Sequence, residues 1–223
     1  MNGSKSETLR TRVKLFSAPL SATTRILIGR SELPTLICDH LVLLHQITRA
    51  SVPLMVAAHR ETERAASDPV CRLLGPYLIK HIEEEMHHDN WTLEDLDAVG
   101  VSSASVLAAP PPANVAALVG AQYYWIYHFH PVALMGYMIM LESNAPSMDL
   151  VDEIVQRTSL PEQFFRTHRI HAALDPGHQA DLYELIDELP LSQNQERLIG
   201  YSIAHTGLML ANCLATPQLW KAT

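Results

Sequence analysis

Apolar residues recur at helical spacing along most of this chain, and no segment alternates between apolar and polar residues for long. Repeats of three and four residues place apolar side chains on one face of a helix, whereas strict alternation is typical of strands. Only nine glycines interrupt the pattern in 223 residues. The chain is therefore predicted to be all-α, with seven or eight helices.

Prolines, glycines and polar residues mark where these helices begin and end. Residues 1–30 are predicted to be a partly flexible N-terminal segment with a short helix or loop, and residues 31–223 a single helical domain. Pro53 predicts either a kink in the first long helix or a break of this helix into two. The predicted helices cover residues 31–66, 70–99, 114–142, 150–156, 161–174, 175–189 and 192–214, with a loop at 101–113 and breaks near Gly75–Pro76 and His130–Pro131.

Composition excludes several classes of protein. Hydrophobic residues make up 48% and charged residues 18% of the chain, which is enough apolar material for one sizeable core. The net charge of −8 argues against nucleic acid or an anionic membrane as a partner. We expect no signal peptide and no apolar run long enough to span a bilayer. Three separated cysteines without a Cys-x-x-Cys pair favour the reducing cytoplasm.

A stretch that is rich in histidine carries the most specific chemical signal. His171, Asp175 and His178 occupy relative positions 0, 4 and 7, which share one face of a helix. Two imidazoles and a carboxylate on one face form half of a metal site. The alternative is a surface turn, which Pro176 and Gly177 would support. We predict that Asp175 lies at a kink or helix restart, with all three side chains still facing the metal.

A second cluster lies at residues 81–89, where one histidine precedes three glutamates and two histidines and an aspartate follow them. Glu85 and His88 are three residues apart, a spacing that di-iron proteins use within helical bundles. The same spacing joins Glu84 to His87, so the spacing alone leaves the register open. The alternative is a charged helix face in water, which is the usual role of an acidic run.

A third feature is Glu142, which follows a run of apolar residues. A buried carboxylate must be paired or bind a metal, although the polar residues after it also fit a helix end in water. Taken together, three imidazoles and three carboxylates suit two divalent iron ions better than a structural zinc ion. The candidate metal ligands are Glu85, His88, Glu142, His171, Asp175 and His178.

From about residue 70 onward the chain resembles the heme-oxygenase-like diiron oxidases, also called iron-containing redox enzymes. The motifs that carry the resemblance are His81-x2-Glu84-Glu85-x2-His88 with Trp91 and Glu94-Asp95-Leu96, Pro131-x4-Gly136-x5-Glu142, and His171-x3-Asp175-x2-His178. The resemblance implies a heme-oxygenase-like helical bundle that holds an iron pair inside it. It also implies that the six candidate residues are the iron ligands.

The resemblance further implies that two Fe(II) ions activate dioxygen and oxidise a small molecule. Related reactions act on amines, guanidines, amino acids and fatty acids, often in natural-product biosynthesis. We therefore expect a small-molecule substrate, O2 and an external electron donor as partners, and a homodimer by analogy of fold. Replacement of one iron by manganese is an open alternative.

Two other activities and a non-catalytic role compete with this interpretation. A thiaminase II-like hydrolase needs a nucleophilic cysteine, for which Cys71 is the candidate. A heme oxygenase needs one proximal histidine and leaves the other ligands unexplained. A helical interaction protein would carry the same clusters on its surface. The aromatic stretch 123–130 can line a pocket or pack in the core, and the candidates for binding a substrate carboxylate are Arg49, Arg60, Arg166 and Arg169.

Overall fold

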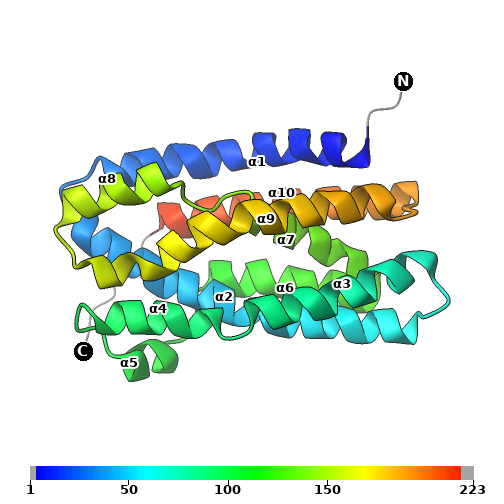
Figure 1. Ribbon diagram of the computed structural model, residues 1–223, viewed down its shortest axis with the longest axis horizontal. Helices are drawn as coiled ribbons and strands as arrows, with labels where there is room; N and C mark the ends of the chain where they lie inside the picture. Colours follow the sequence, from blue (N-terminus) through cyan, green and yellow to red (C-terminus); the bar gives the residue numbers. More distant parts are fainter. Residues whose placement is uncertain (1–3, 217–223) are drawn as a thin grey trace.

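The computed structural model describes residues 4–216, which fold into a bundle of helices with no strand among them (Figure 1). The all-α prediction is confirmed. This part of the chain contains ten α-helices and two 3-10 helices. They are α1 (Lys5–Ile28), α2 (Leu33–Arg64), α3 (Pro69–Glu85), α4 (His88–Asp97), α5 (Ser103–Ala108), α6 (Ala113–His128), η1 (Pro131–Ala133), α7 (Leu134–Glu142), α8 (Met148–Thr158), η2 (Glu162–Phe165), α9 (Arg166–Glu188) and α10 (Gln193–Ala215).

The N-terminal segment differs from expectation. Instead of a short helix or loop it contains α1, a helix of 24 residues that packs along α10. Ser4 caps this helix by accepting a hydrogen bond from the Glu7 backbone N–H. Leu9 and Val13, four residues apart, join the main hydrophobic core. The basic and hydroxyl residues around these two positions obscured the helical pattern in the sequence.

The acidic helix breaks at a place that the sequence did not indicate. Residues 70–99 form two helices, α3 and α4, which are separated at Met86 and His87. His87 adopts a left-handed backbone conformation with φ 74°, which ends α3 and starts α4 in a new direction. The expected break at Gly75–Pro76 is wrong, because Pro76 lies inside α3. Leu74 and Leu78 are fully buried on either side of it and hold the helix in place.

The expected helix restart at Asp175 is also wrong. A single helix, α9, runs from Arg166 to Glu188 with Pro176 inside it. Proline removes one backbone hydrogen bond, and the packing of α9 against α4, α7 and α8 outweighs that loss. Other expectations hold: α6 and α7 are separated at His130, and Ser192 caps the last helix. Because the predicted loop at 101–113 contains α5 and the acidic helix is split, the helix count exceeds seven or eight.

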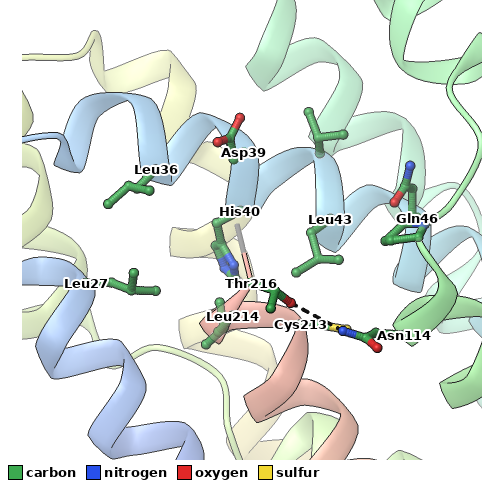
Figure 2. Close-up of a pocket in the computed structure, with 12 residues that line it drawn as sticks. Leu27, Leu36, Asp39, His40, Leu43, Gln46, Asn114, Cys213, Leu214 and Thr216 are labelled. Carbon is green, nitrogen blue, oxygen red and sulfur yellow. Dashed lines mark hydrogen bonds between the residues drawn. The ribbon is translucent and has the colours of Figure 1, made fainter. Parts of the chain in front are cut away.

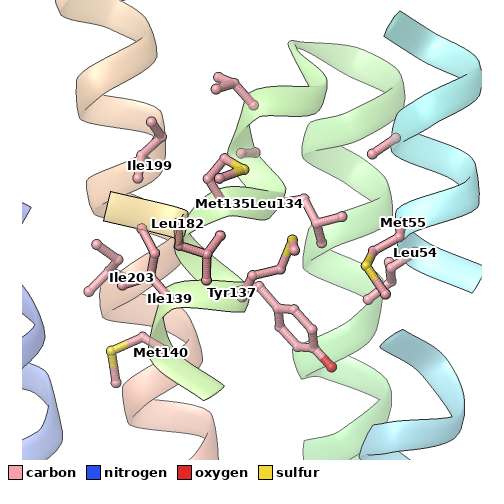
Figure 3. Close-up of a cluster of buried hydrophobic side chains, with 14 of the residues drawn as sticks. Leu54, Met55, Leu134, Met135, Tyr137, Ile139, Met140, Leu182, Ile199 and Ile203 are labelled. Carbon is pink, nitrogen blue, oxygen red and sulfur yellow. The ribbon is translucent and has the colours of Figure 1, made fainter. Parts of the chain in front are cut away.

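The main hydrophobic core surrounds α7, which is buried from Leu134 to Met140 (Figure 3). Close packing between α7 and α10 depends on Gly136. A Cβ at this position would lie 2.5 Å from the backbone oxygen of Ile199, so a larger residue would push the helices apart. This packing fixes the end of α7, where Glu142 lies, in the middle of the bundle.

Two helices of the described residues, α2 and α10, are long and apolar enough by length and composition to cross a membrane. The expectation that no apolar run has this length is therefore wrong. Half of each apolar window is buried inside the bundle. α2 packs against α3, α4 and α6, and α10 packs against α1, α6 and α7. The core of the bundle thus accounts for the apolar character of both helices.

Candidate metal centre

The structure brings all six sequence-predicted candidates into one region at the centre of the bundle. The six residues come from four helices, α3, α4, α7 and α9. Glu85 is the last residue of α3, His88 the first of α4 and Glu142 the last of α7. The remaining three share one face of the unbroken α9, as the spacing of His171, Asp175 and His178 predicts.

One half of this cluster lies around Glu142. The Nδ1 atom of His178 lies 3.5 Å from Oε2 of Glu142 and 3.5 Å from Oε1 of Glu85. The Nε2 atom of His81 lies 3.5 Å from the other carboxylate oxygen of Glu142. Donor atoms of these four residues all lie within 4.8 Å of one another, so they can surround a single metal ion.

The other half lies around His88 and the first turns of α9. The Nδ1 atom of His88 lies 3.0 Å from Oε2 of Glu85. The rings of His88 and His171 meet edge to face with centroids 5.3 Å apart, and Nδ1 of His171 lies 3.3 Å from Oδ1 of Asp175. Glu85 therefore faces both halves, with one carboxylate oxygen toward each. This is the arrangement that a carboxylate bridging two metal ions requires.

Several of these donor atoms are buried without a hydrogen bond. His88 Nδ1, His178 Nδ1 and Glu142 Oε2 have no hydrogen-bond partner in the described part of the chain, although each lies 3.0–3.5 Å from an atom of a neighbouring carboxylate or imidazole. Buried polar atoms are normally hydrogen-bonded. Donors bound at about 2.1 Å to one ion lie roughly 3 Å apart. The donor set therefore fits metal ions between these atoms better than direct hydrogen bonds.

Electrostatics hold the cluster together without a metal. Burial raises the pKa of Glu142, but the His178 and His81 rings outweigh burial and leave that pKa below its ordinary value. The Glu142 carboxylate raises the pKa of His178 to about 9. Burial raises the pKa of Asp175 in spite of the His171 ring. A metal ion must therefore displace protons from this cluster when it binds.

The structure adds one residue that the sequence analysis did not select. His81 is 2% exposed and lies within the cluster. Its distance of four residues from Glu85 places both on one face of α3, and this spacing was the signal that could have identified it. The positions of these side chains favour one register. Glu85 and His88 are buried in the cluster, Glu84 is partly exposed, and His87 is exposed and helps to form the turn.

Aromatic rings cover both halves of the cluster. The Trp91 ring stacks on His88 with centroids 3.8 Å apart, and the Tyr77 ring stacks on His81 at 5.6 Å. Tyr77 is mostly buried, and burial raises its pKa. These rings restrict the orientation of the imidazoles and limit the access of water from the α3 and α4 side.

A cavity of about 600 Å³ opens beside the cluster, within the range of small-molecule sites. Its wall includes His81, Glu85, Glu142, His171 and Asp175. The aromatic stretch 123–130 does not line it. Tyr124, Tyr127 and Phe129 are exposed, so the stretch as a whole does not pack in the core either. The four arginines considered as substrate ligands do not line the cavity. Arg166 pairs with Glu94 and Asp95, and Arg169 pairs with Asp152 and Glu162.

Comparison with solved structures supports the architecture. A domain of unknown function with a heme oxygenase-like fold from Shewanella denitrificans OS217 is similar with a TM-score of 0.78 and 14% identity, covering 93% of this chain and 89% of that one. A TenA homolog from Pseudomonas syringae pv. tomato is similar with a TM-score of 0.69 and 12% identity, covering 93% of this chain and 90% of that one. At these identities the likeness shows the fold alone, and the heme-oxygenase-like fold is confirmed.

Comparison with family models and curated proteins gives one match. No curated protein matches the chain. The model of the family described as iron-containing redox enzyme matches residues 45–205, which include all six predicted ligands and His81. This match covers well over half of the chain, so the protein belongs to the iron-containing redox enzyme family.

Proposed function

We propose that this protein is a non-heme diiron oxidase that activates O2 and oxidises a small molecule. The observation that carries the proposal is the position of Glu85, whose two carboxylate oxygens face two separate sets of donors. Glu142, His178 and His81 would hold one ion. His88, His171 and Asp175 would hold the other, with Glu85 between them. Each ion then has nitrogen and oxygen ligands, which suits Fe(II).

The bound iron pair would supply the electrons that reduce O2, and the chain would supply position and environment. Imidazoles stacked on Trp91 and Tyr77 keep their orientation while ligands exchange. The buried carboxylates balance most of the positive charge of two divalent ions. The bundle excludes water on one side, and the cavity admits the substrate on the other.

Other parts of the proposal rest on the family resemblance. They include an amino-acid-like, amine or fatty-acid substrate, a role in natural-product biosynthesis, an external electron donor, a homodimer and a cytoplasmic location. Nucleic acid and membrane are not proposed as partners. A manganese ion in place of one iron would use the same donors. Metal analysis of the purified protein distinguishes an Fe/Fe centre from an Mn/Fe centre.

The thiaminase II-like alternative requires an activated thiol beside the cavity. Burial raises the pKa of each cysteine thiol, Cys38, Cys71 and Cys213, to about 11, so none is activated as a thiolate. None of the three lines the main cavity in the described residues. The interaction-protein alternative expects the acidic and histidine clusters in water, whereas the candidate ligands are largely buried.

Anaerobic titration with Fe(II) tests the proposal. Two equivalents should bind, and mixing the loaded protein with O2 in a stopped-flow instrument should give an absorption change that metal-free protein lacks. The variants His171→Ala and His178→Ala should each reduce iron content. An exposed histidine outside the cluster, in the variant His128→Ala, is the matched control. Wild-type protein that binds no iron would contradict the proposal.

A further inference from the structure

Trp91 connects the candidate metal centre with the surface of the bundle. Its ring stacks on the ring of His88 with centroids 3.8 Å apart, and it meets the ring of His171 edge to face at 6.1 Å. Both histidines are proposed iron ligands. Trp91 is only partly buried, and its indole nitrogen, which makes no hydrogen bond within residues 4–216, is not buried. The ring therefore touches a ligand with its face and reaches water with its N–H edge.

The proposed reaction gives such a ring a role. Two Fe(II) ions that react with O2 leave a strong oxidant at the centre. When the cavity holds no substrate, that oxidant takes electrons from neighbouring side chains. An indole gives up one electron before its N–H proton leaves, whereas a phenol gives up an electron only as its proton moves to a base. The fate of the proton therefore decides which neighbouring ring is oxidised.

The two buried tyrosines near the centre lack a base that could take the proton. The Tyr77 ring stacks on His81 at 5.6 Å, and its buried hydroxyl has no hydrogen-bond partner in the described part of the chain. Burial also raises the pKa of Tyr77. The Tyr137 hydroxyl lies 3.1 Å from Oγ of Ser51, which is a neutral hydroxyl and a poor base. Both phenols therefore resist oxidation, although both lie near the cluster.

The substrate cavity offers no indole. Among the described residues that line the main cavity, Tyr137 is the one phenol and tryptophan is absent. Figure 2 shows the adjoining pocket of about 70 Å³, where His40 lies near Leu27, Leu36 and Leu43. Neither tryptophan nor tyrosine lines this pocket within residues 4–216. An electron that passes through Trp91 thus reaches the centre without crossing the space for the substrate.

We propose that Trp91 is a redox relay, which supplies one electron to the centre when O2 reacts there in the absence of substrate. The inference rests on the proposed function for the oxidant. Trp91 loses one electron, which passes through the His88 ring and reduces the oxidised centre. The indole cation radical then releases its N–H proton to water. A one-electron donor outside the protein returns the electron, and water returns the proton, so the indole is regenerated and the iron ligands are spared.

The surface around Trp91 indicates the charge of this donor. Residues 81–97 contain seven acidic residues and neither lysine nor arginine. Glu83, Glu94 and Asp97 are exposed among them. Lys80 and Arg166 pair with some of these carboxylates and leave the stretch negative. A negative surface attracts cations and repels anions, so the donor that fits is a positively charged one-electron reductant.

Electron paramagnetic resonance tests the relay. Full-length protein loaded anaerobically with Fe(II) is mixed with O2 without substrate and frozen at a series of short times. The wild type should give an indole radical whose signal changes when its tryptophans are deuterated on the ring. Trp91→Phe keeps an aromatic ring on His88 and should bind the same iron but lose the signal. Trp125→Phe is the matched control, since that ring packs on His205 between α6 and α10, and it should keep the signal.

Repeated oxidation leaves a second, permanent readout. After many cycles of Fe(II) loading and exposure to O2 without a donor, peptide mass mapping should find added oxygen at Trp91 and none at Trp125 or Tyr77. The Trp91→Phe protein should lose its capacity to bind iron severalfold faster than the wild type, because oxidation then falls on the ligands. Iron oxidation without an indole radical and without modification of Trp91 would overturn the relay and leave the proposed function standing. Absence of iron binding would overturn the proposed function instead.

Two small reductants test the charge of the donor. Hexaammineruthenium(II) is a cation and ferrocyanide is an anion, and each is added to the wild-type protein while the radical is present. At low salt the cation should remove the radical signal at least about tenfold faster than the anion. The difference should shrink as salt is added, because salt screens the acidic surface. If the anion reacted as fast as the cation at low salt, the assignment of a cationic donor would be wrong.

Discussion

Among residues 4–216, two groups of side chains have the composition of a metal site, and only the central cluster has buried donor atoms without a hydrogen-bond partner. The central cluster is built from residues of α3, α4, α7 and α9. The second group, Asp68, Cys71 and His130, lies where α3 begins and α6 ends. Its distances are similar: His130 Nε2 lies 3.5 Å from Asp68 Oδ2 and 3.7 Å from Cys71 Sγ. Distances between donor atoms therefore do not separate the two groups.

The two groups differ in the hydrogen bonds that their donor atoms make. Nδ1 of His130 accepts a hydrogen bond from the Val132 backbone N–H, so the neutral ring carries its proton on Nε2, the atom that faces Asp68 and Cys71. A metal at Nε2 would force that proton to Nδ1 and break the cap. Asp68 caps α3 by accepting from the backbone N–H groups of Val70 and Cys71. In the central cluster, His88 Nδ1, His178 Nδ1 and Glu142 Oε2 have no such partner among the described residues. The availability of lone pairs, more than proximity, distinguishes a metal site.

The largest expected effect comes from removing the carboxylate that faces both halves of the central cluster. Glu85→Ala should reduce bound iron from two equivalents to less than one, because each ion loses a ligand and the link between them disappears. Asp68→Ala, the matched change in the second group, should leave iron content unchanged. Elemental analysis of proteins loaded anaerobically measures both. Loss of iron from the Asp68 variant would show that the second group also binds iron.

A smaller effect separates the two halves of the central cluster. His88→Ala should remove about one equivalent of iron and leave the ion at Glu142 and His178 in place. His81→Ala should weaken the ion at Glu142 about tenfold or more while the other ion stays. Competition with a chelator of known affinity measures the affinity of the protein for each of the two ions. If His81→Ala left both affinities unchanged, His81 would be a neighbour of the site and not a ligand.

The sequence predicts which side chains gather at this site better than it predicts the helices that carry them. The six candidate ligands were identified from spacing and resemblance, and the structure brings them together. The spacing of Glu85 and His88 was explained by a shared helical face, yet they lie on two helices joined at His87. A left-handed turn in a non-glycine residue is held by surrounding tertiary contacts, so local sequence does not indicate it. His81 stands in the motif that carries the resemblance, but its spacing of four residues from Glu85 was not used to select it as a ligand.

A third group, His40 and His168, has buried ring nitrogens without a hydrogen-bond partner in the described residues. The folded-state pKa values of His40 and His168 lie below the ordinary value of 6.5, at about 4 and about 3, mainly because of burial. Their contribution to stability is therefore present above pH 6.5 and is lost as pH falls toward those values. The metal-free protein should lose several kcal/mol of unfolding free energy between about pH 6.5 and 4. Urea unfolding measures this loss, and the His168→Phe variant should lose less. If the unfolding free energies of the wild-type protein and the His168→Phe variant fell equally with pH, His168 would not be a source of the pH dependence.

The smallest expected effect tests whether the second group is purely structural. His130→Ala removes the cap on η1 and should cost about 1 kcal/mol of stability. His130→Asn should restore most of that loss, because its side-chain oxygen can accept from the Val132 N–H, while it cannot reproduce an imidazole ligand. Urea unfolding and metal analysis together decide the outcome. If both variants kept full stability but lost a bound ion, the second group would be a metal site. Free lone pairs would then no longer distinguish the central cluster. If His130→Ala lowers the stability, His130→Asn restores it and the iron content stays constant, His130 acts as a helix cap and not as a metal ligand.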